Sequence, residues 1–370
     1  KALSVSTNID FDIEHGGYNI PVSVEGHTSP IQLLIDTGSS NLNLIGAPKI
    51  CPSCEPITGG KQRYQAKTPV KKIDKKFEMH YGAGGGKLQQ YQGTVNLFDK
   101  KLRLDNYTFG VYQSGKYISN IVGFAFEAAA APRKAPLPTL FSLLNKKYDF
   151  NNQFTLQYCD TQGTSKLYLG PTPKIFTYLP QYSTPVMHKS LYFIQHFAVS
   201  TPGGDKLIDV PKGDYTIVDS GTTAKIIYPA VQIKSLIKYL KKHTDAKNQK
   251  LPEVFWKGKT CIEAVAIDIK AFPTLYFHFK DIHGKPFKLP LPPERYVTQS
   301  SCGKGYYKLA FIGMDEHRKD KKNLHHKKNQ PGFAILGTPF IEQYATSFKQ
   351  AYPAILTFYD GRDILCGKNK

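Results

Sequence analysis

The stretch IQLLIDTGSSNLNLIG, residues 31–46, runs an apolar segment directly into an aspartate, Asp36, and then breaks into a glycine turn. A carboxylate at the end of a buried strand is costly to ionise unless a partner compensates it. The same order of residues returns as YTIVDSGTTAKIIYP, residues 215–229, where an apolar segment leads into Asp219. The chain therefore carries two equivalent aspartate turns, and each is a candidate partner for the other.

A second pair of similar segments follows the aspartate turns, one in each half. The segments are NIVGFAF, residues 120–126, and AILGTPF, residues 334–340, and both place a glycine after two apolar residues. Two elements, an aspartate turn and an apolar-glycine segment, recur in the same order in both halves and indicate a duplicated unit of roughly 180 residues. We therefore expect an N-terminal lobe at 1–180 and a C-terminal lobe at 181–370.

Most of the chain reads as short strands punctuated by glycine, proline and asparagine, which predicts an all-β, mainly antiparallel fold. Two amphipathic segments, around 137–147 and 228–243, predict short helices on the surface of a sheet. If the halves pack about a pseudo-twofold axis, Asp36 and Asp219 face each other. Two adjacent carboxylates share one proton, so the pair supplies a general base and a general acid around one water.

The residues that flank the two aspartates fit the same geometry. Small and hydroxyl side chains occupy matching places in both turns: Thr37, Gly38, Ser39, Ser220, Gly221 and Thr222. We expect the glycines to allow tight turns, Thr37 and Ser220 to bond across the axis, and Ser39 and Thr222 to donate to the outer carboxylate oxygens. Two ordinary Asx turns would explain each aspartate singly, but not the paired apolar-glycine elements.

These motifs resemble the pepsin-like aspartic endopeptidases, and the likeness covers essentially the whole chain. LIDTGSSNL, IVDSGTT and the two apolar-glycine elements carry it. The resemblance implies a two-lobed fold with pseudo-twofold symmetry and a β-hairpin flap that closes over the substrate. HYGAGGGKL, residues 80–88, resembles that flap, with Tyr81 before a tip at Gly82 and Ala83. The expected substrate-binding residues are Gly38, Tyr81, Gly82, Ala83, Tyr192, Gly221 and Thr222.

One residue departs from the family pattern. Where a tryptophan commonly follows S-S-N-L and bonds the flap tyrosine, this chain has Asn43. Tyr81 must then bond Asn43, another group or water. The cleft beside Asn43 should be roomier or more polar than in pepsin.

The six cysteines include one C-x-x-C, Cys51 and Cys54, for which a zinc half-site or a redox pair is the alternative to a disulfide. No second pair lies nearby, so disulfides in an exported protein are the better interpretation. The resemblance implies the pairs 51–54, 261–302 and 159–366. We expect a secreted protein or one in an exported compartment, whether extracellular, periplasmic or acidic vacuolar and lysosomal.

The net charge of +20 raises the alternative of a cationic surface-binding protein. The lysines are scattered, however, without a nucleic-acid module around them. A charged segment, residues 315–330, is expected to be a solvated loop; it contains Lys321, Lys322, His325, His326, Lys327 and Lys328. The chain contains no apolar run of 18 residues, so no membrane span is predicted. The first residues resemble a mature terminus, so we expect any export signal or pro-segment to have been removed.

The expected function is that of an aspartic endopeptidase, which hydrolyses peptide bonds between apolar residues at acidic pH. The reaction requires neither a metal nor any other cofactor. The expected partners are a peptide or protein substrate and statine-type inhibitors, and the family pattern implies a monomer. The main alternative is a non-catalytic binding or inhibitor protein with the same fold. Retention of both D-[T/S]-G elements favours the enzyme.

Overall fold

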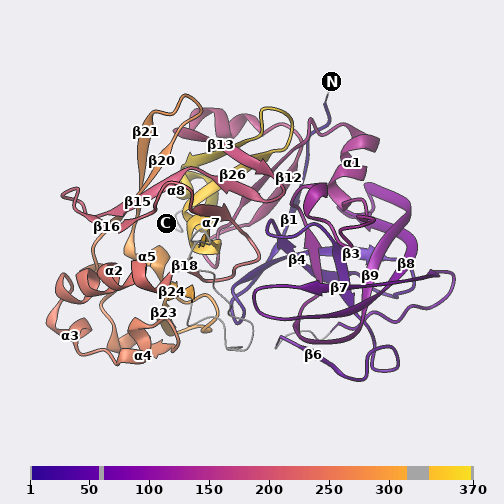
Figure 1. The fold of residues 1–370 in the computed structure, drawn as a ribbon, viewed down its shortest axis with the longest axis horizontal. Coiled ribbons are helices and arrows are strands. Elements are labelled where there is room, and N and C mark those ends of the chain that lie inside the picture. The colour runs from indigo at the N-terminus through magenta and orange to yellow at the C-terminus, as the bar shows by residue number, and fades with distance from the viewer. Residues whose placement is uncertain (1, 58–61, 315–332, 368–370) are drawn as a thin grey trace.

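The computed structural model of the 370-residue chain describes residues 2–57, 62–314 and 333–367. The charged segment at 315–330, with the lysines and histidines named above, lies outside the described residues. The described chain forms two β-rich lobes that lie side by side, with most of the first half on the right in Figure 1 and most of the second on the left. The expected all-β, mainly antiparallel, two-lobed architecture is thus confirmed.

The first half consists mainly of strands. Its elements are β1 (Val5–Asn8), β2 (Asp10–Asp12), β3 (Gly17–Val24), β4 (Ile31–Asp36), β5 (Leu42–Ile45), β6 (Cys54–Pro56), β7 (Lys71–His80), β8 (Gly85–Leu97), β9 (Leu102–Ile118), β10 (Ile121–Gly123), η1 (Glu127–Ala129), α1 (Leu140–Tyr148), β11 (Gln153–Gln157), β12 (Lys166–Leu169) and η2 (Lys174–Tyr178).

The second half adds a group of short helices to its strands. Its elements are β13 (Gln181–Lys189), β14 (Tyr192–Ile194), β15 (His196–Ser200), β16 (Lys206–Asp209), β17 (Tyr215–Val218), β18 (Ile226–Tyr228), α2 (Ala230–Lys242), α3 (Ala246–Gln249), α4 (Glu253–Trp256), β19 (Ile262–Glu263), η3 (Ala264–Ala266), η4 (Ile269–Ala271), β20 (Leu275–Lys280), β21 (Pro286–Leu291), α5 (Pro293–Tyr296), β22 (Val297–Thr298), β23 (Tyr306–Leu309), β24 (Phe311–Gly313), β25 (Phe333–Leu336), α7 (Thr338–Gln343), β26 (Tyr344–Lys349), β27 (Ile355–Asp360) and α8 (Arg362–Cys366).

The two aspartate turns lie in matching strand arrangements. In the first half, β10 pairs in parallel with β4 and antiparallel with β5, and Gly123 lies opposite Asp36. In the second half, β25 pairs in parallel with β17 and antiparallel with β18. The buried positions of β4 alternate as a strand with one fully covered face requires. The repeat in the sequence is therefore a repeat of strand pairing.

One sheet is shared between the halves. Its eleven strands run in the order β1-β12-β11-β26-β27-β13-β14-β17-β25-β18-β24. At the junction, β11 of the first half pairs antiparallel with β26 of the second, and Phe154 stacks on Phe348 with ring centroids 4.8 Å apart. A nine-stranded sheet, β2-β3-β4-β10-β5-β9-β8-β7, completes the first lobe, and β6 also pairs with β9. Smaller sheets, β16-β15-β20-β21 and β19-β23-β22, complete the second.

The expected helices form close to their predicted ranges. α1 begins after Thr139, whose hydroxyl oxygen accepts a hydrogen bond from Ser142 N, and it buries Leu140, Phe141 and Leu144. α2 buries Ile233, Leu236 and Leu240 and carries two lysines in its last turn. No helix among the described residues has the length and apolar character of a membrane span.

Three disulfides cross-link the chain, and their pairing is the one that the family resemblance implied. Cys51 bonds Cys54, Cys261 bonds Cys302, and Cys159 bonds Cys366. The last bridge joins segments 207 residues apart, next to the sheet that both halves share. It therefore links the end of the first half to the last helix, α8.

Candidate active site

The two aspartates lie on opposite turns at the junction of the lobes. Asp36 is the last residue of β4 and is 4% exposed; Asp219 directly follows β17. A methyl group on Gly38 would lie 2.5 Å from Asp219 Oδ1, and one on Gly221 would collide with Asp36 Oδ1. Each carboxylate therefore rests against the glycine of the other turn, a contact that only glycine permits.

Thr37 and Ser220 connect the two turns. Thr37 N donates to Ser220 Oγ at 2.9 Å, and Ser220 N donates to Thr37 Oγ1 at 2.9 Å. Each hydroxyl then donates to a backbone carbonyl of the opposite turn, Thr37 to Val218 O at 3.0 Å and Ser220 to Ile35 O at 2.7 Å. This reciprocal set, buried from solvent, holds the aspartates in register.

The two oxygens of each carboxylate accept the same kinds of hydrogen bond, one from a backbone amide and one from a side-chain hydroxyl. Gly38 N donates to Asp36 Oδ1 at 2.8 Å, and Ser39 Oγ donates to Asp36 Oδ2. In the second turn, Gly221 N donates to Asp219 Oδ1 at 2.8 Å, and Thr222 Oγ1 donates to Asp219 Oδ2 at 2.7 Å. The pair is therefore close to symmetric at the atomic level.

Burial and the neighbouring Asp219 raise the pKa of Asp36 well above its usual range, whereas the hydrogen bonds from Ser39 and Gly38 lower it. Desolvation disfavours the charged form, and a second carboxylate nearby disfavours it further. Asp36 therefore holds a proton at a pH where an exposed aspartate has lost it. That is the electrostatic behaviour expected of two carboxylates that share one proton.

Two glycines lie behind the aspartate turns. A methyl group on Gly123 would collide with Ser39 O and Ser40 N, and one on Gly337 would collide with Thr222 O. Next to Gly123, Phe124 N donates to Asp36 O at 2.8 Å. The apolar-glycine elements thus support the two aspartate turns through backbone contact.

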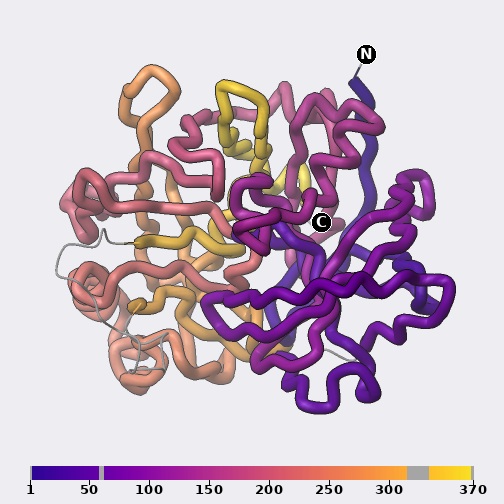
Figure 2. Tube along the Cα trace, turned by 45° about the vertical axis from the view of Figure 1, so that its right-hand side comes forward, coloured from indigo at the N-terminus to yellow at the C-terminus, as the bar shows by residue number. Residues whose placement is uncertain are grey.

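The segment predicted to be a flap forms the β7–β8 hairpin, and Figures 1 and 2 show that this hairpin extends toward the second half. Tyr81 follows β7, and the exposed residues Gly82 and Ala83 form the tip. Asn43 Nδ2 donates to Tyr81 Oη at 2.9 Å, which selects among the three partners left open by the sequence. Gly110, opposite Asn43 across the sheet, has no side chain, and a methyl group there would collide with Asn43 Oδ1.

Tyr192 lies in the interior, away from this group. Its side chain is fully buried, and its hydroxyl donates to Phe124 O at 2.6 Å and accepts from Gln350 Nε2 at 2.8 Å. The structure brings the other sequence-predicted residues together around the aspartates and the flap. Tyr192 instead packs behind β10, in the core between the halves.

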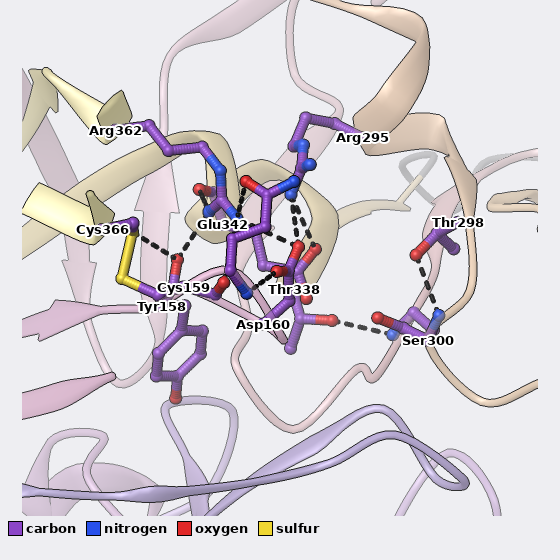
Figure 3. Close-up of polar contacts among 12 residues, drawn as sticks. Tyr158, Cys159, Asp160, Arg295, Thr298, Ser300, Thr338, Glu342, Arg362 and Cys366 are labelled. Atoms are coloured by element: carbon purple, nitrogen blue, oxygen red, sulfur yellow. Dashed lines mark hydrogen bonds and ion pairs between the residues drawn. A yellow bond between two sulfur atoms is a disulfide. The ribbon is translucent and has the colours of Figure 1, made fainter. Parts of the chain in front are cut away.

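A buried charged cluster near the lobe junction has no counterpart in the sequence-based predictions. Asp160 Oδ2 lies 2.7 Å from Arg295 Nη1 and 3.0 Å from Arg362 Nη2 (Figure 3). Glu342 lies beside them, and Tyr18 donates to its Oε1 at 2.8 Å. These side chains come from five separate segments, so no local motif marks them.

Among residues 2–57, 62–314 and 333–367, no three histidine, cysteine, aspartate or glutamate side chains are placed to hold a metal ion.

Comparison with known proteins gives two findings. The family model for the eukaryotic aspartyl proteases matches residues 17–356. Among curated proteins, Aspartic protease 3 of Toxoplasma gondii is 22% identical over 378 residues. That similarity covers 94% of this chain and 52% of the relative, so the chain spans about half the length of the curated protein it matches.

Proposed function

Because the chain belongs to the eukaryotic aspartyl protease family, we propose that it is an aspartic endopeptidase whose catalytic residues are Asp36 and Asp219. The observation that carries the proposal is the reciprocal geometry of the two turns. Each carboxylate rests on the glycine of the other, and each receives one amide and one hydroxyl donor.

In the proposed reaction, one water binds between the two carboxyl groups. The ionised carboxylate takes a proton from this water, and the water oxygen attacks the peptide carbonyl carbon. Asp36, whose pKa is raised by burial and by Asp219, donates its proton to the carbonyl oxygen. The resulting diol then collapses: the amine nitrogen gains the proton that the pair took from the water, the C–N bond breaks, and one diol hydroxyl returns its proton to the pair, which again holds one proton.

The proposed substrate is an extended peptide that lies between the lobes, under the β7–β8 hairpin. Gly82 and Ala83 at the tip have no side-chain hydroxyls, so binding relies on backbone hydrogen bonds and on apolar side chains around the scissile bond. A statine-type inhibitor would place its hydroxyl between the two carboxyl groups. The three disulfides support a location in a secretory or other exported compartment.

The experiment that tests the function is hydrolysis of a denatured protein at about pH 4, with and without a statine-type inhibitor. Asp219→Asn should lower kcat by about 10²–10⁴-fold, because the amide cannot act as a base. Asp209→Asn is the matched control, since Asp209 is an exposed residue of β16 that pairs with Lys206. If folded wild-type protein never cleaves a peptide, the non-catalytic alternative holds.

A further inference from the structure

We propose that Glu342 is a positioning residue for the second catalytic loop, residues 219–224, and that it acts while its carboxyl is neutral. The inference rests on the proposed function, because that loop carries Asp219. Glu342 touches neither the dyad nor the expected substrate path. It acts through the helix on which it lies, α7.

Helix α7 connects the catalytic loop to the charged cluster. At its start, Thr338 N donates to Thr222 O at 3.0 Å, and Thr338 Oγ1 accepts from Ala224 N at 2.8 Å. Thr222 in turn donates to Asp219 at 2.7 Å. Glu342 lies one turn later, near the other end of the helix. A shift of α7 therefore moves the backbone that holds Thr222.

The Glu342 carboxyl contributes to holding the far end of α7, together with the hydrogen bond that Arg362 Nη1 donates to Glu342 O. The side chain is buried, and Oε1 accepts the hydrogen bond from Tyr18 on β3 of the first half. Oε2 lies 3.9 Å from Arg295 Nη1, beyond hydrogen-bond distance, and has no hydrogen-bond partner among the described residues. The bond between Glu342 and Tyr18 thus ties the helix of the second half to the sheet of the first.

The Arg295 guanidinium donates to Asp160 instead. The Arg362 guanidinium forms an ion pair with Asp160 and donates to the backbone carbonyls of Tyr158, Cys159 and Glu342. Asp160 Oδ2 receives Arg295 and Arg362, and Asp160 Oδ1 accepts from Gln162 N at 2.9 Å. Asp160 is therefore a well-compensated carboxylate. An ionised Glu342 would keep one hydroxyl donor and a distant cation, and a buried charge with so few partners is costly. The neutral acid avoids that cost.

The electrostatic environment of Glu342 agrees with this geometry. Burial raises its pKa to about 7, with Arg295 opposing that rise and Asp160 adding to it; Tyr18 and Arg362 also oppose it. Tyr158, after β11, is a further titratable group within its influence. The charged or titratable groups that face it are Tyr18 on β3, Tyr158 and Asp160 after β11, Arg295 on α5 and Arg362 on α8.

The sign of the effect follows from the two pKa values. An unfolded glutamate has a pKa near 4.5, and the folded one titrates near 7. The neutral carboxyl therefore stabilises the fold fully below about pH 4.5, and this stability is lost as the pH rises through 7. Near neutral pH the protein must hold a poorly compensated charge or loosen α7, so the catalytic loop is best supported in acid.

Thermal unfolding of Glu342→Gln tests the proposal without reference to activity. Glutamine mimics the neutral acid at every pH. The melting temperature of wild type minus that of this variant should therefore fall by roughly 4 °C as the pH rises from 4.5 to 7.5. Glu294→Gln is the matched control, because Glu294 is an exposed neighbour on α5. It should follow the wild-type pH dependence.

Amide hydrogen exchange of residues 216–228 tests the positioning role. After correction for intrinsic rates, protection in wild type should fall about tenfold or more between pH 5 and 7.5, and Glu342→Gln should not show this fall. A fall of equal size in both proteins would overturn the proposal, as would no fall in wild type. If Glu342→Gln does not fold, Tyr18→Phe replaces it: loss of the hydroxyl should move the fall to higher pH.

These readouts separate the two proposals. A protein that melts and exchanges as expected but cleaves no peptide retains the Glu342 inference and loses the endopeptidase. A protein that cleaves peptides through Asp219, but whose loop protection does not depend on Glu342, retains the enzyme and loses the inference.

Discussion

Ser39 and Thr222 are the hydroxyl residues that contact the two carboxyl groups. Each donates its hydroxyl hydrogen to the outer oxygen of its own aspartate. A donor to the ionised form lowers a pKa, and in Asp36 it opposes the larger effects of burial and of Asp219. The pH range of the proposed activity should therefore respond to the Ser39 hydroxyl.

Ser39→Ala should move the alkaline limb of the kcat/KM profile upward by roughly one pH unit. The variant removes a hydrogen bond that lowers the pKa of Asp36, so the dyad keeps its proton to higher pH. The measurement is kcat/KM for one peptide between about pH 3 and 8. Ser40→Ala is the control, since Ser40 donates to Phe126 O and not to a carboxylate. A downward shift would contradict the assignment.

Asn43 is expected to hold the flap tyrosine over the cleft. Asn43→Ala should reduce kcat/KM about fivefold to tenfold, as loss of one net hydrogen bond predicts. If Asn43 acts only through Tyr81, then Asn43→Ala should have little effect in a Tyr81→Phe background. A double-mutant cycle measures this coupling, and strictly additive effects would show that Asn43 acts elsewhere.

The residues of the dyad could be predicted because their pattern is local and repeated. An aspartate turn and an apolar-glycine element recur in the same order, so two copies identify each other. The partner of Tyr81 could not be chosen, because it depends on a contact across the sheet that Gly110 makes possible. No sequence pattern marks the buried charged cluster, because its side chains come together only through tertiary packing; they are those of Asp160, Arg295, Glu342 and Arg362.

Among the elements, β10 and β25 support the backbone of the two aspartate turns. Each runs parallel to the strand that leads into an aspartate. β10 ends at Gly123 and β25 is followed by Gly337, and each glycine contacts the backbone of the aspartate turn in its own half. Their short length is sufficient because their role is to define the backbone path of the turn. The helices at 137–147 and 228–243 were predictable from their amphipathic pattern.

Gly123→Ala should lower the free energy of unfolding by about 1–3 kcal/mol, because the added methyl group collides with the backbone of Ser39 and Ser40. It should also reduce kcat, since the collision displaces the turn that follows Asp36. Guanidinium unfolding and a peptide assay measure the two effects. In Gly203→Ala, the nearest atom would be 3.7 Å away, so this control should be near neutral. An undisturbed Gly123→Ala enzyme would refute the proposed support.

For the molecule as a whole, the Cys159–Cys366 bridge closes the longest loop of the three disulfides. Replacing both cysteines by alanine should lower the free energy of unfolding by roughly 3–5 kcal/mol, against roughly 1–2 kcal/mol for Cys51 and Cys54. The reason is that a longer loop gains more conformational freedom in the unfolded chain. Guanidinium unfolding of the two double variants measures the difference, and a larger loss for the 51–54 pair would contradict it.

The shared eleven-stranded sheet has a consequence for synthesis on the ribosome. Strands β1, β12 and β11 come from the first half. β11 pairs on one side with β12, but its partner on the other side is β26, which begins at Tyr344. Until that strand has been translated, β11 presents unpaired backbone groups at a sheet edge, a surface that favours aggregation. A nascent chain must therefore keep this edge protected through most of its elongation. We expect truncations before residue 344 to associate with chaperones or precipitate.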